Sequence, residues 1–316
     1  MGKIVVIGGG SGIFNVLKGL KNYPVEITSI VTTFDNGGST GLLKDEFGIL
    51  PPGDIRRSLV ALAPDSGNSA LRDLLSFRFP KDSSLNGHSF GNLFLQALTS
   101  ISGSEVGAIK TASDLLNIKH KILPVSIDKA TLCARLIDGS VIRGETDIDI
   151  PKHDGSIKIK ELYLEPEAII YKEAYDAICK ADLIIIGPGD LFTSILPNIL
   201  VKSFTEAVKK SKGKVVYIMN LMTKWGETNG FKASDFVKIL LTYLKRKYVD
   251  YLIINNSPIK HSLAKKYEAE KSFPVENDLS NLKKFAGKII AEDVVLQKEI
   301  ARHDPEKISR IIMKLI

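Results

Sequence analysis

The stretch Gly187-Pro188-Gly189-Asp190-Leu191-Phe192-Thr193-Ser194 decides the fold of this 316-residue chain. It follows Asp182 to Ile186, a short run whose isoleucines are typical of a strand buried on both faces. It precedes a periodic segment that predicts a helix over 190–210, bent at Pro197. Because unpaired amides and the helix dipole favour negative charge at a helix start, this turn predicts an anion-binding site.

Two more glycine-rich turns follow predicted strands near the N-terminus. The turn at 8–12 comes after a strand at 3–7, and the loop at 33–41 comes after a strand at 26–32. The carboxyl ends of parallel strands meet at one edge of a sheet, where ligands bind in doubly wound folds. We therefore expect the glycine turns, with the segments 86–92 and 220–229, to surround one phosphorylated ligand.

The remaining pattern predicts an α/β fold, a Rossmann-like three-layer αβα arrangement with a mostly parallel sheet. We expect a single nucleotide-binding domain over 1–316, with an inserted β-hairpin region at about 119–165 marked by alternating segments and Asp-Gly turns. Asp54 is predicted to be the N-cap of a helix that runs to Ala63. Asp304 before Pro305 predicts the start of the last helix.

Composition excludes several classes of protein. The net charge is +7, but the lysines are scattered over segments that read as solvated helix faces, which argues against nucleic acid. No run approaches the roughly 18 apolar residues needed to span a bilayer. Cys133 and Cys179 lack metal-ligand spacing and indicate a reducing compartment, so we expect a cytoplasmic protein. The oligomeric state stays open, a homo-oligomer included.

The candidate ligand-binding residues lie in or beside these turns and loops. They are Gly9, Gly10, Ser11, Gly12, Asp35, Asn36, Gly37, Gly38, Ser39, His88, Ser89, Asn92, Gly187, Pro188, Gly189, Asp190, Thr223 and Thr228. Glu227 is a further residue that could line the pocket, and Arg302 could reach an anion from its position before the last helix.

Asp35 and Asp54 are the candidates for metal binding or catalysis. Two carboxylates together with ligand phosphate oxygens suit Mg²⁺, which takes few protein ligands. The alternatives are an Asx-turn for Asp35 and a simple helix cap for Asp54. The sequence offers no motif for a nucleophile, so whether it is an enzyme stays open, and catalysis would depend on positioning and electrostatics.

An NAD-binding protein is a further alternative. Gly8 and Gly10 fill two places of the dinucleotide fingerprint, but Ile13 stands in the third. The second strand also ends in another glycine loop and not in a lone ribose-binding acid. These departures disfavour NAD.

Seven motifs together resemble the YvcK/CofD-like family, and they run in the expected order over nearly the whole chain. They are Gly8 to Gly12, Asp35 to Gly41, Pro51 to Arg56, His88 to Leu93, Gly187 to Ser194, Met222 to Thr228 and Ala301 to Pro305. The bacterial YvcK branch, the gluconeogenesis factors, is the nearest in pattern.

This resemblance implies a Rossmann-like cytoplasmic protein that is needed for growth and cell shape on gluconeogenic carbon sources. It also implies binding of UDP-sugars such as UDP-N-acetylglucosamine, with Tyr267 and Arg302 at the positions that match the sugar-nucleotide contacts. The CofD branch is similar in its glycine turns but transfers 2-phospholactate to a deazaflavin with Mg²⁺, with acids matching Asp35 and Asp54 as metal candidates.

The chain departs from the family pattern in four places. Asn36 replaces the second of two paired aspartates, which removes a charge from the metal candidates, and Thr40 replaces a serine. Lys224-Trp225 stands where Gln-Pro is usual. Phe236 replaces a histidine, which puts an acid–base role at that position in doubt.

Overall fold

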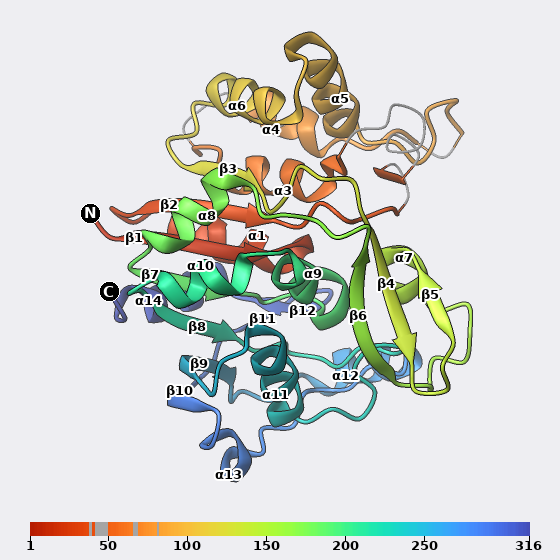
Figure 1. The fold of residues 1–316 in the computed structure, drawn as a ribbon, viewed down its shortest axis with the longest axis vertical. Coiled ribbons are helices and arrows are strands. Elements are labelled where there is room, and N and C mark those ends of the chain that lie inside the picture. The colour runs from red at the N-terminus through yellow and green to blue at the C-terminus, as the bar shows by residue number, and fades with distance from the viewer. Residues whose placement is uncertain (38–39, 42–49, 66–68, 81) are drawn as a thin grey trace.

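The centre of the molecule is a seven-stranded parallel sheet, in the order β10–β9–β8–β7–β1–β2–β3 (Figure 1). The structure is a computed structural model and describes residues 1–37, 40–41, 50–65, 69–80 and 82–316. The strands are β1 (Lys3–Gly8), β2 (Glu26–Val31), β3 (Lys121–Pro124), β7 (Leu183–Ile186), β8 (Lys214–Ile218), β9 (Val249–Asn255) and β10 (Ala286–Glu292).

Burial of the central strands on both faces follows from their apolar runs. In β1, Val5 and Ile7 point to one core, whereas Ile4 and Val6 point to the other, as the two-residue period of a strand requires. All four residues of β7 are buried between β1 and β8. A strand with this pattern needs helices on both faces.

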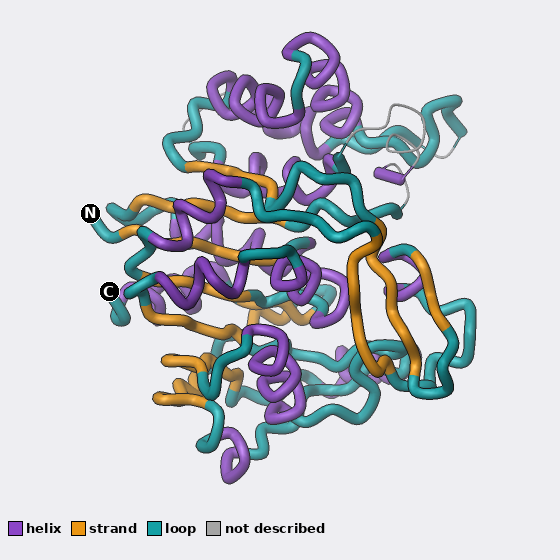
Figure 2. Tube along the Cα trace, in the orientation of Figure 1, coloured by secondary structure: helices purple, strands orange, loops and turns teal. Residues whose placement is uncertain are grey.

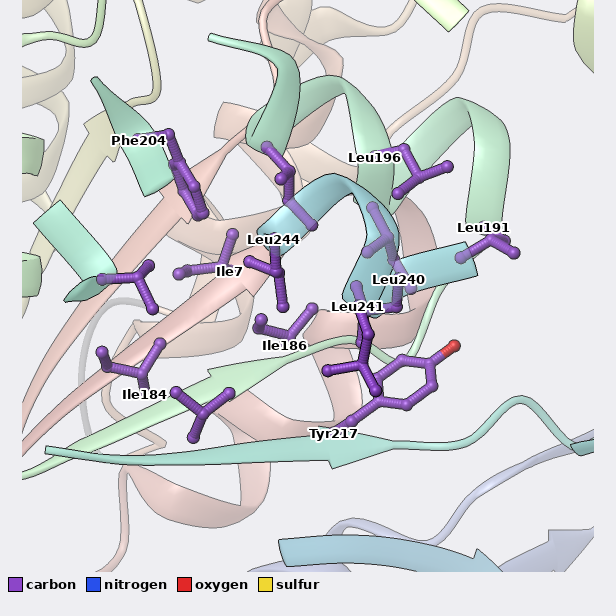
Figure 3. Packing of buried hydrophobic residues seen from close by; sticks show 14 of the residues in the cluster. Ile7, Ile184, Ile186, Leu191, Leu196, Phe204, Tyr217, Leu240, Leu241 and Leu244 are labelled. Atoms are coloured by element: carbon purple, nitrogen blue, oxygen red, sulfur yellow. The ribbon is translucent and has the colours of Figure 1, made fainter. Parts of the chain in front are cut away.

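Helices supply both outer layers. One face carries α8 (Lys172–Cys179), α9 (Leu196–Leu200), α10 (Phe204–Lys210) and α11 (Ala233–Leu244), and the other carries α1 (Gly10–Leu20), α3 (Pro52–Leu62) and α14 (Pro305–Met313). Figure 3 shows Leu240, Leu241 and Leu244 of α11 above Ile184 and Ile186 of β7. The predicted three-layer α/β fold is confirmed.

Smaller elements surround this frame. Beyond β3 lie α4 (Ser69–Ser76), α5 (Phe90–Ser102) and α6 (Glu105–Leu115). Near the other end of the sheet lie α12 (His261–Ala269) and α13 (Leu279–Leu282). The antiparallel pair β11 (Val295–Gln297) and β12 (Ala301–His303) lies beside the middle of the sheet, where β12 packs against α1. The last helix begins as predicted, because the Asp304 side chain accepts hydrogen bonds from the amides of Glu306 and Lys307.

A separate antiparallel sheet stands beside the carboxyl edge of the main sheet, in the order β5 (Val141–Arg143), β4 (Thr131–Leu136) and β6 (Ile159–Glu165). Figure 2 shows loops between the two sheets. This sheet fits the predicted insertion, but its expected start at about residue 119 is wrong because β3 pairs with β2 in the main sheet. The short helix α7 (Glu145–Asp149) follows β5 and faces the main sheet's turns.

Two predicted helix boundaries are also wrong. The segment 190–210 is a π-helical turn η1 (Leu191–Ile195), then α9, then a break at 201–203 before α10. The break arises because Lys202 pairs with residues 168–170: its amide donates to Ala168 O and its carbonyl accepts from Ile170 N. Pro197 lies in the first turn of α9, where proline is tolerated. Helix α3 begins at Pro52, so Asp54 lies in its first turn and is not its N-cap.

Candidate functional site

The turns after β1, β7 and β8 meet β12 around a cleft of about 310 Å³. Of the predicted ligand-binding residues, those that line it are Gly9, Gly12, Pro188, Gly189, Asp190, Thr223, Tyr267 and Arg302. The turns at 8–12 and 187–190 and the start of the 220–229 segment therefore converge at the carboxyl edge, as expected for a doubly wound sheet.

Close backbone approach explains the glycines at this edge. A Cβ atom on Gly9 would overlap the carboxylate of Asp54, and one on Gly12 would overlap the carbonyl oxygen of Pro188. Among the described residues, none accepts a hydrogen bond from the Gly189 amide. The Gly189 carbonyl accepts from Asn220 Nδ2 at 2.7 Å, which ties the turn after β7 to the end of β8.

Other amides of the glycine turns already have protein partners. Gly187 donates to the carbonyl oxygen of Ile7, and Gly37 donates to Asp35 Oδ1 at 2.8 Å. At the start of η1, the Phe192 amide donates to Glu227 Oε2 at 3.0 Å. The expectation that this helix start offers free amides to an anion is therefore wrong at Phe192, because a protein carboxylate takes that place.

Strand β12 forms the far wall of the cleft and is fixed from two sides. The Tyr267 hydroxyl contacts both backbone groups of Ala301, accepting from its amide at 3.1 Å. The ring of His303 is buried with Nε2 3.0 Å from the carbonyl oxygen of Met219, and burial lowers its pKa to about 4. Arg302, between these two anchors, is exposed and lines the cleft.

Three carboxylates surround the ammonium group of Lys224 at one end of the cleft. Lys224 Nζ contacts the carboxylate of Asp149 from α7, Asp190 Oδ2 at 2.9 Å and Glu227 Oε1 at 3.5 Å. Burial opposes the charged form of Lys224, but the carboxylates of Glu227, Asp190 and Asp149 outweigh it and raise the pKa. We call Lys224, Asp149, Asp190 and Glu227 the lysine cluster.

Glu227 is the buried member of the lysine cluster. Its side chain has no exposed surface, and it accepts from the Thr193 hydroxyl at 3.1 Å as well as from the Phe192 amide. Burial raises the pKa of Glu227 to about 8. The cluster therefore joins three segments far apart in sequence: α7 of the small sheet, the turn after β7 and the loop after β8.

The two acids predicted to bind Mg²⁺ also have protein partners. Asp54 Oδ1 accepts from Arg57 at 2.9 Å, and Asp35 Oδ1 accepts the amide of Gly37. Asn36 Oδ1 accepts from the Thr146 amide at 2.9 Å, so this side chain links its loop to α7. Asp35 also lies against Glu145, whose pKa rises to about 9 through burial and then through the charges of Asp35 and Asp149.

The protein partners of Asp35 and Asp54 bear on whether these two acids could bind a divalent cation. An arginine neutralises one of the two expected ligands, and the neighbouring position carries an amide where a carboxylate would be needed. Among the described residues, the group of three carboxylates whose oxygen atoms all lie within 4.8 Å of one another is Asp149, Asp190 and Glu227, and these hold Lys224. The metal-binding and catalytic roles of Asp35 and Asp54 stay predictions.

Several predicted residues lie elsewhere. Ser89 caps α5 by accepting the Asn92 amide, and Asn92 Oδ1 accepts from Arg56 Nε at 3.1 Å. Thr228 accepts the Lys224 amide at 2.8 Å. None of these residues, nor His88, lines the cleft. Gly38 and Ser39 lie outside the described residues, as does the side chain of Ser11.

A larger hollow of about 630 Å³ lies at the opposite, amino edge of the sheet, beside Lys3, Glu26 and Lys121. It contains none of the glycine turns. We take the smaller cleft as the candidate site because the glycine turns whose backbones lie close together and Arg302 both line it.

Asp149, Lys224 and Glu145 belong to this edge and were not predicted from the sequence. The one signal for Lys224 was its departure from the Gln-Pro of the family pattern. The described part of the chain holds no helix with the length and apolar character required to cross a bilayer.

Comparisons with known proteins agree with the motifs. The family profile described as 2-phospho-L-lactate transferase CofD matches residues 4–295. The chain is 42% identical to the gluconeogenesis factor of Bacillus subtilis over 316 residues, covering 99% of this chain and 98% of that protein. It is 41% identical to the gluconeogenesis factor of Halalkalibacterium halodurans over 313 residues, covering 98% and 95%.

A solved structure supports the same assignment. A crystal structure of a Bacillus halodurans member of the UPF0052 family matches with a TM-score of 0.93 at 40% identity, covering 99% of this chain and 100% of that chain. With the profile match over most of the chain, these findings lead to one conclusion: the chain belongs to the YvcK/CofD-like family, in the branch of the gluconeogenesis factors.

Proposed function

We propose that this protein binds a nucleotide sugar, a UDP-sugar in particular, in the cleft at the carboxyl edge of its sheet. The observation that carries the proposal is the junction of the turns after β1 and β7 with Arg302 of β12 in one cleft. Backbone amides and an arginine are the groups that bind diphosphates in proteins.

The anchors of β12 support the same proposal. The Tyr267 hydroxyl and the buried His303 ring fix the backbone on both sides of Arg302, so this backbone loses little freedom when the guanidinium meets a phosphate. Tyr267 also presents its own surface to the cleft, where a sugar ring would pack.

We infer a regulatory role from the family. Relatives covering nearly the whole chain are named gluconeogenesis factors, so we propose that ligand binding regulates growth and cell shape on gluconeogenic carbon sources, in the cytoplasm. The free cysteines Cys133 and Cys179 fit this location, because burial raises the pKa of both thiols and keeps them unreactive.

Thermal unfolding with and without UDP-N-acetylglucosamine tests the ligand. At about 100 times its dissociation constant, the ligand should stabilise the fold by ~2.7 kcal/mol. A folded sample that gives no shift with any UDP-sugar would remove the proposal. NAD serves as the comparison ligand and should give a smaller shift.

A transferase of the CofD kind is the second candidate, favoured by the family profile over residues 4–295. It would move a phosphorus-containing group from a guanosine-linked donor to a deazaflavin with Mg²⁺. Incubation with both substrates and Mg²⁺, followed by mass spectrometry, tests it. No transferred product, from a sample that binds UDP-sugar, would leave the regulatory proposal alone.

A further inference from the structure

A second hollow, of about 230 Å³, adjoins the cleft at the carboxyl ends of β8 and β9. The two hollows share Asn220 and Leu221 as a common wall. Asn255, Asn256 and Asn277 also line the second hollow, so four of its side chains are carboxamides. We call it the amide pocket.

The amide pocket differs from the cleft in charge. Of the ten described residues that line it, none has a charged side chain, although 25% of the chain is charged. The cleft next to it is lined by Asp190, Lys224, Glu270 and Arg302. A ligand that spans both hollows would therefore place its anionic part beside Arg302 and a neutral part among the asparagines.

The asparagine side chains leave hydrogen-bond acceptors for such a neutral group. Asn256 Nδ2 donates to Ala291 O at 2.9 Å, and Asn277 Nδ2 donates to Asn255 O at 2.7 Å. Among the described residues, none donates to the Oδ1 atom of either side chain. Asn220, which lines the pocket, carries a buried Oδ1 atom that has no hydrogen-bond partner among the described residues.

Asn255 fixes the shape of the amide pocket and is not free to bind. Its Nδ2 donates to Ser257 O at 2.6 Å, and its Oδ1 accepts from the amides of Ser257 and Val294 at 3.3 Å. The turn after β9 is thereby fixed before any ligand arrives.

The apolar residues that line the amide pocket favour a planar ring over a sugar as the bound group. Leu221, Pro258, Ile259, Pro274 and Val275 line the amide pocket between the carboxamides. A nucleobase has two apolar faces and a polar edge with N–H donors, which match aliphatic walls and amide oxygens. A sugar would expose hydroxyl groups to those same walls.

We propose that the amide pocket is the subsite for the nucleobase, with the diphosphate in the neighbouring cleft. The inference rests on the proposed nucleotide ligand and adds where its base binds. Asn220 stands between the two parts: its side chain lines both hollows, and its Nδ2 holds Gly189 O of the diphosphate turn.

Calorimetric titrations with UDP, GDP and pyrophosphate test this assignment. Asn256→Ala and Asn277→Ala should each weaken binding of the preferred nucleoside diphosphate by about tenfold, the effect of one lost hydrogen bond. Binding of pyrophosphate should not change, because it lacks a base. Arg302→Ala should weaken the nucleotide and pyrophosphate alike. Asn281→Ala, on α13 outside the amide pocket, is the matched control.

The outcomes separate the two proposals. If wild-type protein binds a nucleoside diphosphate and both asparagine variants bind it equally well, the base binds elsewhere. The inference about the amide pocket then fails, while the proposed function stands. If the variants lose pyrophosphate binding to the same extent, the asparagines act on the fold or the diphosphate, which also overturns it. If wild-type protein binds no nucleotide, the proposed function fails first. Thermal unfolding of each variant shows whether it is folded.

Discussion

The carbonyl oxygen of Pro188 occupies the space in which a side chain on Gly12 would begin. Helix α1 and the turn after β7 come from positions about 175 residues apart, yet their backbones touch here at the carboxyl edge. The contact fixes the separation of the two glycine turns, which together line the side of the cleft opposite β12.

Replacing Gly12 with alanine should therefore disturb the fold more than replacing Gly189. A new Cβ at 12 meets rigid backbone, whereas one at 189 meets Ser194 Cβ at 3.3 Å and Gly9 O at 3.5 Å. We expect Gly12→Ala to cost roughly 1–3 kcal/mol of unfolding free energy and Gly189→Ala less than about 1 kcal/mol. Denaturant unfolding measures both. Equal losses of unfolding free energy in the two variants would mean that the backbone contact between Gly12 and Pro188 is not rigid.

Arg302→Ala should weaken UDP-sugar binding by ~1.5–3 kcal/mol, the range for a hydrogen bond to a charged group. The unfolding free energy should change little, since Arg302 is exposed. Arg310→Ala on α14 is the control, because this exposed arginine lies outside the cleft. A titration curve that stays the same in Arg302→Ala would place this side chain outside the site.

Lys224→Gln should destabilise the fold, because it leaves Asp149, Asp190 and Glu227 facing one another without a cation. We expect a loss of about 1–3 kcal/mol, less than for a fully buried pair since Asp190 is 40% exposed. Lys232→Gln removes a surface pair with Glu276 and should cost under about 1 kcal/mol.

Added Mg²⁺ provides a second measurement on the same variant. The cation should raise the melting temperature of Lys224→Gln more than that of wild type, because three carboxylates then lack a positive charge. Equal response of the two proteins would show that the lysine cluster needs no cation.

Stability should depend on pH through Glu145. Its pKa rises from an ordinary value of 4.5 to about 9 in the folded state, so the folded protein retains a proton that the unfolded chain loses. This contribution to stability is complete below pH 4.5 and is lost as the pH rises to about 9.

Glu145→Gln keeps a donor for Asp35 without a proton to lose. The variant should be about 1–3 kcal/mol more stable than wild type at pH 8 and closely similar at pH 4. Glu268→Gln, at an exposed position of α12, is the control. Parallel stability curves for Glu145→Gln and wild type across this range would contradict the assignment.

The central strands and the start of the last helix could be predicted because the local sequence pattern agrees with the burial of these elements. The isoleucines of β7 and the apolar run of β1 are too short for helices and too apolar for edge strands, so they predict the centre of a parallel sheet. Asp304 before Pro305 predicts the start of α14 because capping depends on adjacent residues.

Boundaries that depend on distant partners could not be predicted. The break after α9 exists because Lys202 pairs with the segment near Ile169, and β3 joins the main sheet through its pairing with β2. Nothing local distinguishes β3 from the strands of the small sheet. Tertiary hydrogen bonds override the helical periodicity of residues 190–210.

The residues of the candidate site also divide into those that local sequence predicts and those that depend on distant partners. Glycine turns at strand ends could be placed from the sequence, and so could Arg302 through its motif. The lysine cluster could not, because Lys224 and Asp149 are separated by 75 residues and meet only after the small sheet folds against the main one. The amide pocket was missed because Asn256 and Asn277 belong to no motif.

The position of β12 has a consequence for synthesis of the protein. Residues 301–303 form one wall of the cleft, while the turn at 8–12 is made among the first residues. A growing chain on the ribosome therefore carries the glycine turns long before it has the opposite wall. The proposed ligand would therefore find its complete cleft only on a chain elongated past His303, after the early stages of co-translational folding.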